Sequence, residues 1–396
     1  MKINTDPQKI EALLTRGVEQ VVDRAHLEQK LKSGKRLRIK LGIDPTSPNI
    51  HIGRAVTLLK LRDFQELGHQ IVFIVGDFTG VIGDTSDKES ERPMLTRGQV
   101  EANMEGYFAQ AAKIIDIREC EKYQNSEWLG KLNYHQICEQ ASQFSVAEFT
   151  ARDNIKKRLD GGTRVSLREM LYPLMQGYDS VEVKADVELG GRDQWFNLLA
   201  GRTLQQYYKQ EPQDILIGPL LEGTDGRKMS SSWGNTINLL AEPNDMFGKI
   251  MAIGDNLIIK YFTLTTRVAM EEINQYENEL KSGKNPRDIK IKLAHEIVRL
   301  YHGVKEADKA QEYFVSTFSK KEIPEEMLEI NASSLSRAFI IELLVESKLV
   351  ATKSDARRVI RDGGVKINGK RNDNIHAEIK SGDIIQKGSR WFVRVK

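Results

Sequence analysis

Three patterns predict an α/β fold with a parallel sheet for this chain of 396 residues. Apolar residues alternate with polar residues or glycine over 37–43, which is the period-2 pattern of a strand. Residues 51–68 carry apolar side chains at helical spacing, and the apolar run at 71–75 fits a strand buried on both faces. A strand, a helix and a second strand in this order form a βαβ unit, whose strands run parallel.

The remainder of residues 1–240 extends this sheet. Residues 97–165 are mostly polar with helical patterning, which predicts a helical insertion over one edge of the sheet. Alternation over 181–189 predicts another strand, a helix is expected from Asp193, and 214–221 predicts a further strand. We expect no regular element over 223–235, where glycine and serine are frequent.

Three segments complete the predicted organisation: a helical domain at 241–318, a linker at 319–334 and a small basic α+β module at 335–396. The module has fourteen Lys and Arg against seven Asp and Glu, a net charge of +7. Because the whole chain carries +3, the preceding 334 residues carry −4. Such asymmetry is typical of a polyanion partner such as nucleic acid, and a merely solvated basic face is the alternative.

The composition excludes several classes of protein. With 40% hydrophobic and 29% charged residues, the chain is neither collagen-like nor disordered. No apolar stretch approaches the ~18 residues of a membrane helix, and the first residues lack the apolar run of a signal peptide, so we expect a cytoplasmic protein with no membrane partner. Cys120 and Cys138 stand apart from any CxxC or Cys/His cluster, so neither a disulfide nor a metal site is expected.

The turn between the first strand and helix is the first candidate site. It contains Asp44 and Thr46 and ends in His51, Gly53 and Arg54. Ligands of open α/β sheets bind at the carboxyl ends of strands, and the free N–H groups of a helix N-terminus favour phosphate. A single histidine at this place is also a common capping or core residue, and that alternative stays open.

A polar stripe on a helix is the second candidate. Tyr172, Gln176 and Asp179 are spaced i, i+4 and i+7, so they project from one side of a helix. A phenol, an amide and a carboxylate together can bind a small zwitterion, although a solvent-facing stripe has the same spacing. Gln194, after the glycine pair 190–191, adds an amide at the start of another helix.

A glycine-flanked loop is the third candidate. Its lysine and three hydroxyls can close over a polyphosphate and neutralise charge that develops in a transition state. A flexible linker is the alternative. The GxxxxGK[ST] and GxGxxG patterns are absent, so neither a P-loop nor a dinucleotide turn supplies a phosphate site. The loop consists of Lys228, Met229, Ser230, Ser231 and Ser232.

The order of these motifs resembles one enzyme family. HIGR at 51–54 and KMSSS at 228–232, separated by YPLMQGYD and GGRDQ, are similar to the HIGH and KMSKS signatures of class I aminoacyl-tRNA synthetases, and specifically of the bacterial tyrosyl-tRNA synthetases. The tail SKLVATKSDARRVIRDGGVKINGK resembles an S4 RNA-binding domain. The resemblance runs from near Leu37 to the end of the chain. It implies a Rossmann-like catalytic domain at 1–240 and an S4-like domain at 335–396.

The resemblance also implies roles for single residues. His51, Arg54 and Lys228 would be catalytic, and Lys88 and Arg92 match basic residues that the family uses on phosphate. Tyr172 and Gln176 would bind the substrate ammonium, Asp179 the phenol, and Gln194 the carboxylate side. The implied ATP site comprises Asp44, Thr46, His51, Gly53, Lys228, Met229, Ser230, Ser231 and Ser232; the implied tyrosine site Lys40, Asp77, Asp84, Tyr172, Gln176, Asp179 and Gln194; the implied tRNA contacts Lys353, Arg357, Arg358, Arg361, Lys366 and Lys370.

Three positions depart from the family pattern. Arg54 replaces the second histidine of HIGH, which places a permanent charge where an imidazole is expected. Ser231 replaces the second lysine of KMSKS, and Arg227, Lys88 or Arg92 would have to compensate. Lys40 stands where some members have a tyrosine that contacts the substrate phenol, so Asp179 needs another partner, for which Asp77 is the candidate.

The implied activity is a two-step ligation. Tyrosine and ATP would give tyrosyl-adenylate and pyrophosphate, and the terminal ribose of tRNA(Tyr) would then take the tyrosine. Magnesium would accompany ATP as part of the substrate, with no bound prosthetic group, and we expect a homodimer. A tryptophanyl enzyme is the rival within the class, and a non-catalytic RNA-binding relative is the rival outside it.

Overall fold

A computed structural model describes residues 2–86, 94–319, 327–331, 339–388 and 391–396. The chain divides into two compact units, which we describe separately. The first comprises residues 1–241 and 252–293, and the second comprises 242–251 and 294–396.

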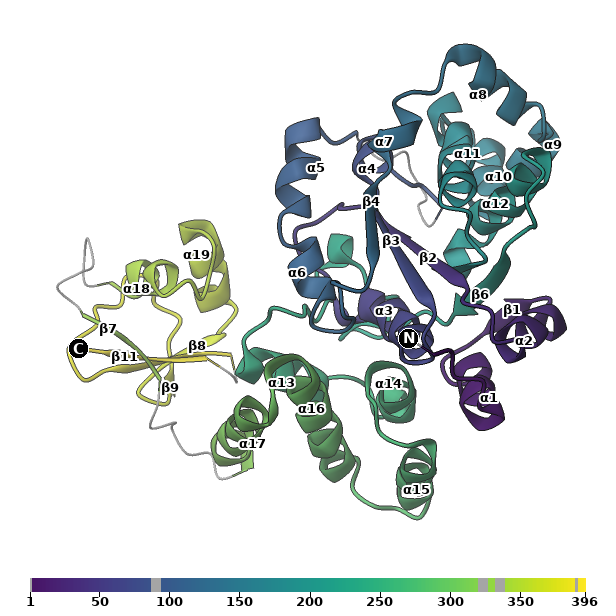
Figure 1. Ribbon diagram of the computed structural model, residues 1–396. Helices are drawn as coiled ribbons and strands as arrows, with labels where there is room; N and C mark the ends of the chain where they lie inside the picture. The colour runs from purple at the N-terminus through teal and green to yellow at the C-terminus, as the bar shows by residue number, and fades with distance from the viewer. Residues whose placement is uncertain (1, 87–93, 320–326, 332–338, 389–390) are drawn as a thin grey trace. The chain divides into compact units, whose positions relative to one another are not determined.

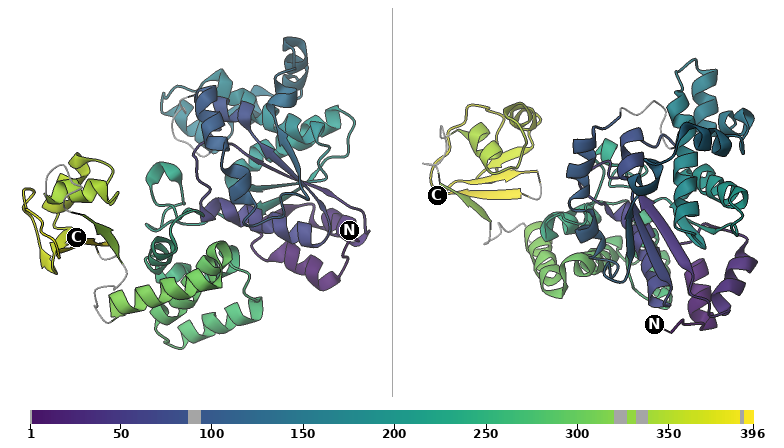
Figure 2. Two further views of the ribbon diagram at one scale, coloured as in Figure 1. Left: turned by 60° about the vertical axis from the view of Figure 1, so that its left-hand side comes forward. Right: turned by 45° about the horizontal axis from the view of Figure 1, so that its top comes forward.

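The first unit contains a six-stranded sheet in the order β1-β6-β5-β2-β3-β4 (Figure 1). All neighbouring strands run parallel except β1, which is antiparallel to β6. The predicted parallel α/β sheet is therefore confirmed, and Figure 2 shows it from two further directions. The strands are β1 (Gln20–Val22), β2 (Arg38–Ile43), β3 (Gln70–Val75), β4 (Glu121–Gln124), β5 (Val187–Gly191) and β6 (Asp214–Gly218).

The predicted βαβ unit forms the centre of this sheet. Helix α3 (Ile52–Glu66) connects β2 to β3, which pair in register from Arg38 with Gln70 to Ile43 with Val75. Ile39, Ile71 and Phe73 are fully buried, as a strand covered on both faces requires. The other helices and 3-10 turns here are α1 (Pro7–Thr15), α2 (Arg24–Lys32), α4 (Asp77–Ile82), η1 (Arg192–Gln194), α12 (Trp195–Tyr207) and η2 (Ser231–Trp233).

The insertion is mostly helical, but it also supplies a strand that the sequence pattern missed. Strand β4 pairs in parallel with β3 and forms the edge of the sheet. Its sequence, EKYQ, is polar and half exposed, so it lacks the apolar run that marks a buried strand. The helices of the insertion are α5 (Arg97–Met104), α6 (Tyr107–Ala111), α7 (Ser126–Leu129), α8 (Tyr134–Ala141), α9 (Val146–Thr150) and α10 (Asp153–Asp160).

The predicted strand at 181–189 is wrong in its first half. Helix α11 (Leu167–Glu182) continues past Val181, and β5 begins only at Val187. Val181 and Val183 alternate because they join two hydrophobic clusters at the end of the helix, not because they belong to a strand. Lys184, with φ of 48°, then turns the chain away from the helical path.

Helices fill most of 243–319. They are α13 (Pro243–Met251), η3 (Asp255–Leu257), α14 (Ile258–Thr265), α15 (Met270–Lys281), α16 (Pro286–His302) and α17 (Val304–Ser319). In the second unit α13 packs against α17, with the Phe247 and Phe314 rings 5.3 Å apart. Within the described ranges, no helix has both the length and the apolar character needed to span a membrane.

A second sheet near the C-terminus has the order β7-β11-β10-β8-β9. Its first strand, β7 (Leu328–Ile330), lies inside the segment predicted as a linker and pairs in parallel with β11, so the linker prediction is wrong for these residues. The predicted basic helix, glycine turn and strand are present as α19 (Lys353–Arg361), Gly363–Gly364 and β8. The other elements are α18 (Ile340–Glu346), β8 (Val365–Ile367), β9 (Lys370–Arg371), β10 (Ile384–Lys387) and β11 (Trp391–Val395).

Candidate active site

A cavity of about 520 Å³ opens in the first unit at the carboxyl ends of β2 and β5. This is the edge at which open parallel sheets bind ligands. All three segments singled out in the sequence contribute to its lining: the turn after β2, the stripe on α11 and the loop after β6. The predicted residues among the lining are Asp44, Thr46, His51, Gly53, Arg54, Asp84, Tyr172, Gln176, Asp179, Gln194, Lys228, Met229, Ser230 and Ser231.

Asp44 lines this cavity and is held by two hydroxyl groups. It accepts hydrogen bonds from the Tyr172 hydroxyl at 2.8 Å and the Thr79 hydroxyl at 2.7 Å. Burial raises the pKa of Asp44 to about 6, although both hydrogen bonds favour the ionised form. Gly76 is required here, since an added Cβ would lie 2.2 Å from Oδ1 of Asp44.

His51 is a buried, neutral donor at the start of α3. The backbone N–H of Arg54 donates to its Nδ1 at 3.3 Å, which leaves the proton on Nε2. Burial, together with the positive charges of Arg54 and Lys228, lowers the pKa of His51 to about 3. Gly53 leaves room for the ring, because a Cβ there would come within 3.0 Å of Nδ1.

Arg54, for which the family resemblance implied a catalytic role, holds the turn after β2. Its guanidinium donates to the Thr46 hydroxyl at 3.0 Å, the Tyr107 hydroxyl at 2.9 Å and the Asp44 carbonyl at 3.3 Å. Three acceptors of the protein itself therefore hold the guanidinium, although the resemblance assigned this side chain to the catalytic step. The side chain still lines the cavity.

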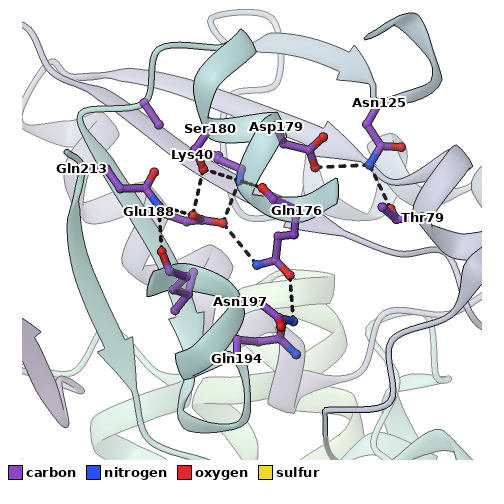
Figure 3. A network of polar contacts seen from close by, with 12 residues as sticks. Lys40, Thr79, Asn125, Gln176, Asp179, Ser180, Glu188, Gln194, Asn197 and Gln213 are labelled. Carbon is purple, nitrogen blue, oxygen red and sulfur yellow. Dashed lines mark hydrogen bonds and ion pairs between the residues drawn. The ribbon is translucent and has the colours of Figure 1, made fainter. Parts of the chain in front are cut away.

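Asp179 receives two hydrogen bonds that no sequence pattern predicted. The Trp128 indole N–H donates to one carboxylate oxygen at 2.8 Å, and the Asn125 amide donates to the other at 3.2 Å. The same amide donates to Thr79 at 2.9 Å (Figure 3). Burial raises the pKa of Asp179 to about 7, despite the opposing effects of Lys40 and these two donors.

Lys40 and Asp77 are not among the described residues that line the cavity, so both expectations need correction. The Lys40 ammonium uses its three donors on the Glu188 carboxylate, the Gln176 carbonyl and the Ser180 hydroxyl, at 2.7–2.8 Å. Asp77 accepts from the backbone N–H of Ser126 at 2.9 Å. Asp179 is therefore supported by Trp128 and Asn125, not by Asp77.

A chain of amides connects the other predicted residues. Asn197 donates to Gln176 at 3.1 Å and to Gln194 at 3.0 Å, and Gln194 donates to Asp84 at 2.6 Å. Figure 3 shows Asn197 between the two glutamines. Gln194 and Gln176 are thus oriented together. Lys88 and Arg92 lie outside the described residues.

The loop after β6 is irregular, as predicted, apart from a bridge between Glu222 and Lys228 and the short turn η2. Lys228 donates to Asp193 at 3.1 Å, Met229 is buried, and the Ser231 hydroxyl lies 3.4 Å from that of Ser47. Ser232 belongs to η2.

Asn235 fixes the conformation of this loop, and the sequence pattern did not single it out. Its side chain accepts from the Ser230 N–H at 2.8 Å and donates to the Lys228 carbonyl at 3.0 Å and to Asp225 at 2.7 Å. A Cβ on Gly223 would lie within 2.4 Å of the Asn235 carbonyl, so that glycine permits the close approach.

The six cations predicted to bind RNA are all exposed. Helix α19 is amphipathic, since Ala356 and Ile360 are buried while its basic residues face outward. Two of them have acidic neighbours: Lys353 pairs with Glu342 and Arg358 with Asp355. The six are Lys353, Arg357, Arg358 and Arg361 on α19, Lys366 on β8 and Lys370 on β9.

The described part of the chain contains no group of three His, Cys, Asp or Glu side chains arranged to hold a metal ion. Cys120 and Cys138 are both free thiols. Burial raises the pKa of Cys120 to about 11, so its thiol is protonated at neutral pH.

Family models match nearly the whole chain. Residues 32–319 match the model of the class I tRNA synthetases (W and Y), and 319–393 match the tyrosine–tRNA ligase SYY-like C-terminal domain. The tyrosine–tRNA ligase of Thermotoga maritima is 44% identical over 393 residues, 98% of each chain. That of Shewanella oneidensis is 45% identical over 98% of this chain and 99% of its own.

Solved structures support the fold. A C-terminally truncated mitochondrial tyrosyl-tRNA synthetase of Aspergillus nidulans matches with a TM-score of 0.67 and 23% identity, over 78% of this chain and 94% of its own. The tyrosyl-tRNA synthetase of Archaeoglobus fulgidus, complexed with L-tyrosine, matches with a TM-score of 0.61 and 24% identity, over 77% of this chain and 99% of its own.

Proposed function

Because the chain belongs to the tyrosine–tRNA ligases of the class I tRNA synthetases, we propose that its cavity binds tyrosine and ATP side by side and joins them. The observation that carries this proposal is that one cavity contains the stripe Tyr172, Gln176 and Asp179 together with His51 and Lys228. The first group suits an amino acid, and the second suits phosphate.

The first chemical step is an in-line displacement at phosphorus. A carboxylate oxygen of tyrosine attacks the α-phosphorus of ATP, and the bond from that phosphorus to the pyrophosphate oxygen breaks. Neutral His51 donates from Nε2 to the α-phosphate region, and Lys228 neutralises the leaving pyrophosphate. The protein supplies position and charge, so the step needs no covalent nucleophile.

Tyrosine recognition uses the opposite end of the cavity. Asp179, held by Trp128 and Asn125, accepts the phenol hydrogen bond. Tyr172 and Gln176 bind the ammonium, and Gln194 lies at the carboxylate side, where Asn197 orients both amides. Asp44, Thr46, Gly53 and Asp84 line the region shared with ATP, together with Met229 and the serines of the loop.

Magnesium enters with ATP, bound chiefly by the phosphates, as this ion prefers. Lys88 and Arg92 act on the same phosphates. They supply the positive charge that is missing because Ser231 replaces the second lysine of KMSKS. No prosthetic group takes part.

The second step transfers tyrosine to the terminal ribose of tRNA(Tyr): a ribose hydroxyl attacks the tyrosyl carbonyl of the adenylate, and AMP leaves. The exposed cations of α19, β8 and β9 bind the phosphate backbone of this RNA. The protein works in the cytoplasm as a homodimer. Exposed apolar side chains on the insertion and at the start of α11 suit an interface between copies: Tyr134, Val146, Leu159 and Leu167.

Exchange of labelled pyrophosphate into ATP tests the proposal. The chain is supplied in turn with tyrosine, tryptophan and phenylalanine, and exchange is expected to be far more efficient with tyrosine than with either of the other two. Efficient exchange with tryptophan instead would mean that the chain is a tryptophanyl enzyme. Absence of exchange with any amino acid, combined with salt-sensitive RNA binding, would make it a non-catalytic RNA-binding relative.

A further inference from the structure

A buried ion pair borders the tyrosine end of the cavity, where Glu188 belongs to the lining and Lys40 does not, and it takes no part in the steps above. Lys40 on β2 and Glu188 on β5 are 0% and 1% exposed, and their charged atoms are 2.8 Å apart. Removing two charges from water costs more than their attraction usually returns. Well-packed apolar residues would fill the same space at less cost, so the pair needs a reason beyond stability.

The Lys40 ammonium is directed at the part of α11 that carries Asp179. It donates to the Gln176 carbonyl at 2.8 Å and to the Ser180 hydroxyl at 2.7 Å, three residues before and one residue after Asp179. Figure 3 shows these contacts and the separate link from Asp179 to Asn125. Lys40 therefore supplies positive charge behind the carboxylate, away from the substrate.

Glu188 holds Lys40 in place and has further partners of its own. It accepts from Ser180 at 3.0 Å, from Gln176 at 3.3 Å and from Gln213. A fully paired carboxylate fixes the ammonium without leaving a buried acceptor unsatisfied.

We propose that Lys40 is a positioning residue for substrate selection: its buried charge stabilises the ionised form of the Asp179 carboxylate, which is the form that accepts the phenol hydrogen bond of tyrosine. The inference rests on the proposed function, because it requires that Asp179 contacts the phenol.

The electrostatic balance at Asp179 supports this role. Burial is the largest effect and raises the pKa of Asp179 to about 7; the charge of Lys40 is the strongest influence that lowers it, and Glu188 raises it. Charged groups of the other elements packed near α11 have other partners. Asp77 of α4 accepts from Ser126, Glu127 of α7 from Gln124, Arg202 of α12 donates to Gln213, and His135 of α8 pairs with Glu139.

Two variants should move the titration of Asp179 in opposite directions. Lys40→Met removes a positive charge, so the pKa of Asp179 should rise by about one unit or more. Glu188→Gln removes a negative charge while keeping an acceptor for Lys40, so the same pKa should fall. Variants that only lose stability would not shift the pKa of Asp179 upward in one case and downward in the other.

The measurement is kcat/KM for tyrosine in pyrophosphate exchange between about pH 5.5 and 9, since this ratio reports groups of the free enzyme. Phenylalanine, measured as an inhibitor, is the control ligand because it lacks only the phenol oxygen. Lys60→Met is the matched control variant. Lys60 is also a buried lysine, bonded to the Leu13 carbonyl at 2.9 Å, and it does not line the cavity.

Opposite shifts of the tyrosine midpoint, with no shift in Lys60→Met or for phenylalanine, support the inference. Unchanged midpoints in Lys40→Met and Glu188→Gln, with reduced thermal stability only, overturn it and make the pair structural. If Lys40→Met fails to fold, the downward shift in Glu188→Gln decides alone. Failure of the unmodified chain to exchange pyrophosphate with tyrosine overturns the proposed function itself, so the two failures are distinguishable.

Discussion

At the scale of single residues, burial decides the chemistry of this cavity. The same loss of water raises the pKa of Asp44 and Asp179 and lowers that of His51, so a neutral imidazole lies near carboxylates that titrate close to pH 7. Such perturbed groups in one cleft are typical of functional sites. Burying these ionisable groups also lowers the free energy of unfolding, and the size of this effect depends on pH.

Asp179→Asn should reveal this effect. The folded chain holds the Asp179 proton up to a pKa of about 7, against 3.8 for an aspartate exposed to water, so ionisation lowers stability as pH rises between these values. The variant lacks this titration. Its free energy of unfolding, relative to the unmodified chain, should therefore improve from pH 4 to pH 8 by on the order of a few kcal/mol. Denaturant unfolding at both pH values measures this difference in the free energy of unfolding. If the difference is the same at pH 4 and pH 8, the pKa of Asp179 in the folded chain is not raised.

His51→Ala and Lys228→Ala should slow activation more than they weaken tyrosine binding, because their phosphate partners gain charge only in the transition state. Single-turnover formation of the adenylate separates the two effects. His135→Ala, at an exposed histidine of α8, is the control and should leave the rate unchanged. Since the pKa of His51 is about 3, its contribution should not vary between about pH 5 and 8. Normal rates in both variants would exclude these residues from the step.

At the scale of elements, the loop after β6 has a fixed conformation because one amide organises it. Asn235→Ala removes bonds to the Lys228 carbonyl and the Ser230 N–H. We expect kcat for activation to fall about tenfold or more while KM for tyrosine changes little, since net bonds of about 1 kcal/mol each are lost. Asn274→Ala, on the exposed side of α15, is the control. A change in KM alone would show that the loop acts on tyrosine binding and not on the phosphates.

Element patterns predicted the centre of the fold well and its edges poorly. The βαβ unit from β2 to β3 carries strong periodicity because it is buried on both faces. Strands β4 and β7 were missed because they are short and largely exposed, and their pairing partners lie far away in the sequence; β4 is polar as well. The alternation of Val181 and Val183 mimicked a strand, although it arises from packing at a helix end.

The residues of the candidate site were likewise predictable only in part. Its motifs are local in sequence, so the turn after β2, the stripe on α11 and the loop at 228–232 could all be found. Trp128, Asn125 and Asn235 could not, because each acts through a contact that only the folded chain creates. Lys40 was recognised as unusual, but its partner Glu188 lies 148 residues away and no local pattern connects them.

At the scale of the whole molecule, a mildly acidic body precedes a basic tail. Arg357→Gln, Arg361→Gln and Lys366→Gln each remove one exposed cation. Each should weaken tRNA binding and reduce the slope of log affinity against log salt by roughly 0.7–0.9 if it contacts one phosphate. Filter binding across a salt series measures the slope, with Lys32→Gln on α2 as the control. If the slopes equal that of the unmodified chain, these three cations do not contact the RNA and other residues bind it.

We propose that the cavity selects tyrosine through Asp179 and activates it with ATP. The ratio of kcat/KM for tyrosine to that for phenylalanine in pyrophosphate exchange tests this selection, compared between the unmodified chain and Asp179→Ala. A charged hydrogen bond of about 1.5–3 kcal/mol is lost, so the preference for tyrosine should fall about ten- to hundredfold while phenylalanine is used no less well. An undiminished preference in the variant would show that the phenol is recognised without Asp179 and that the proposed selection is wrong.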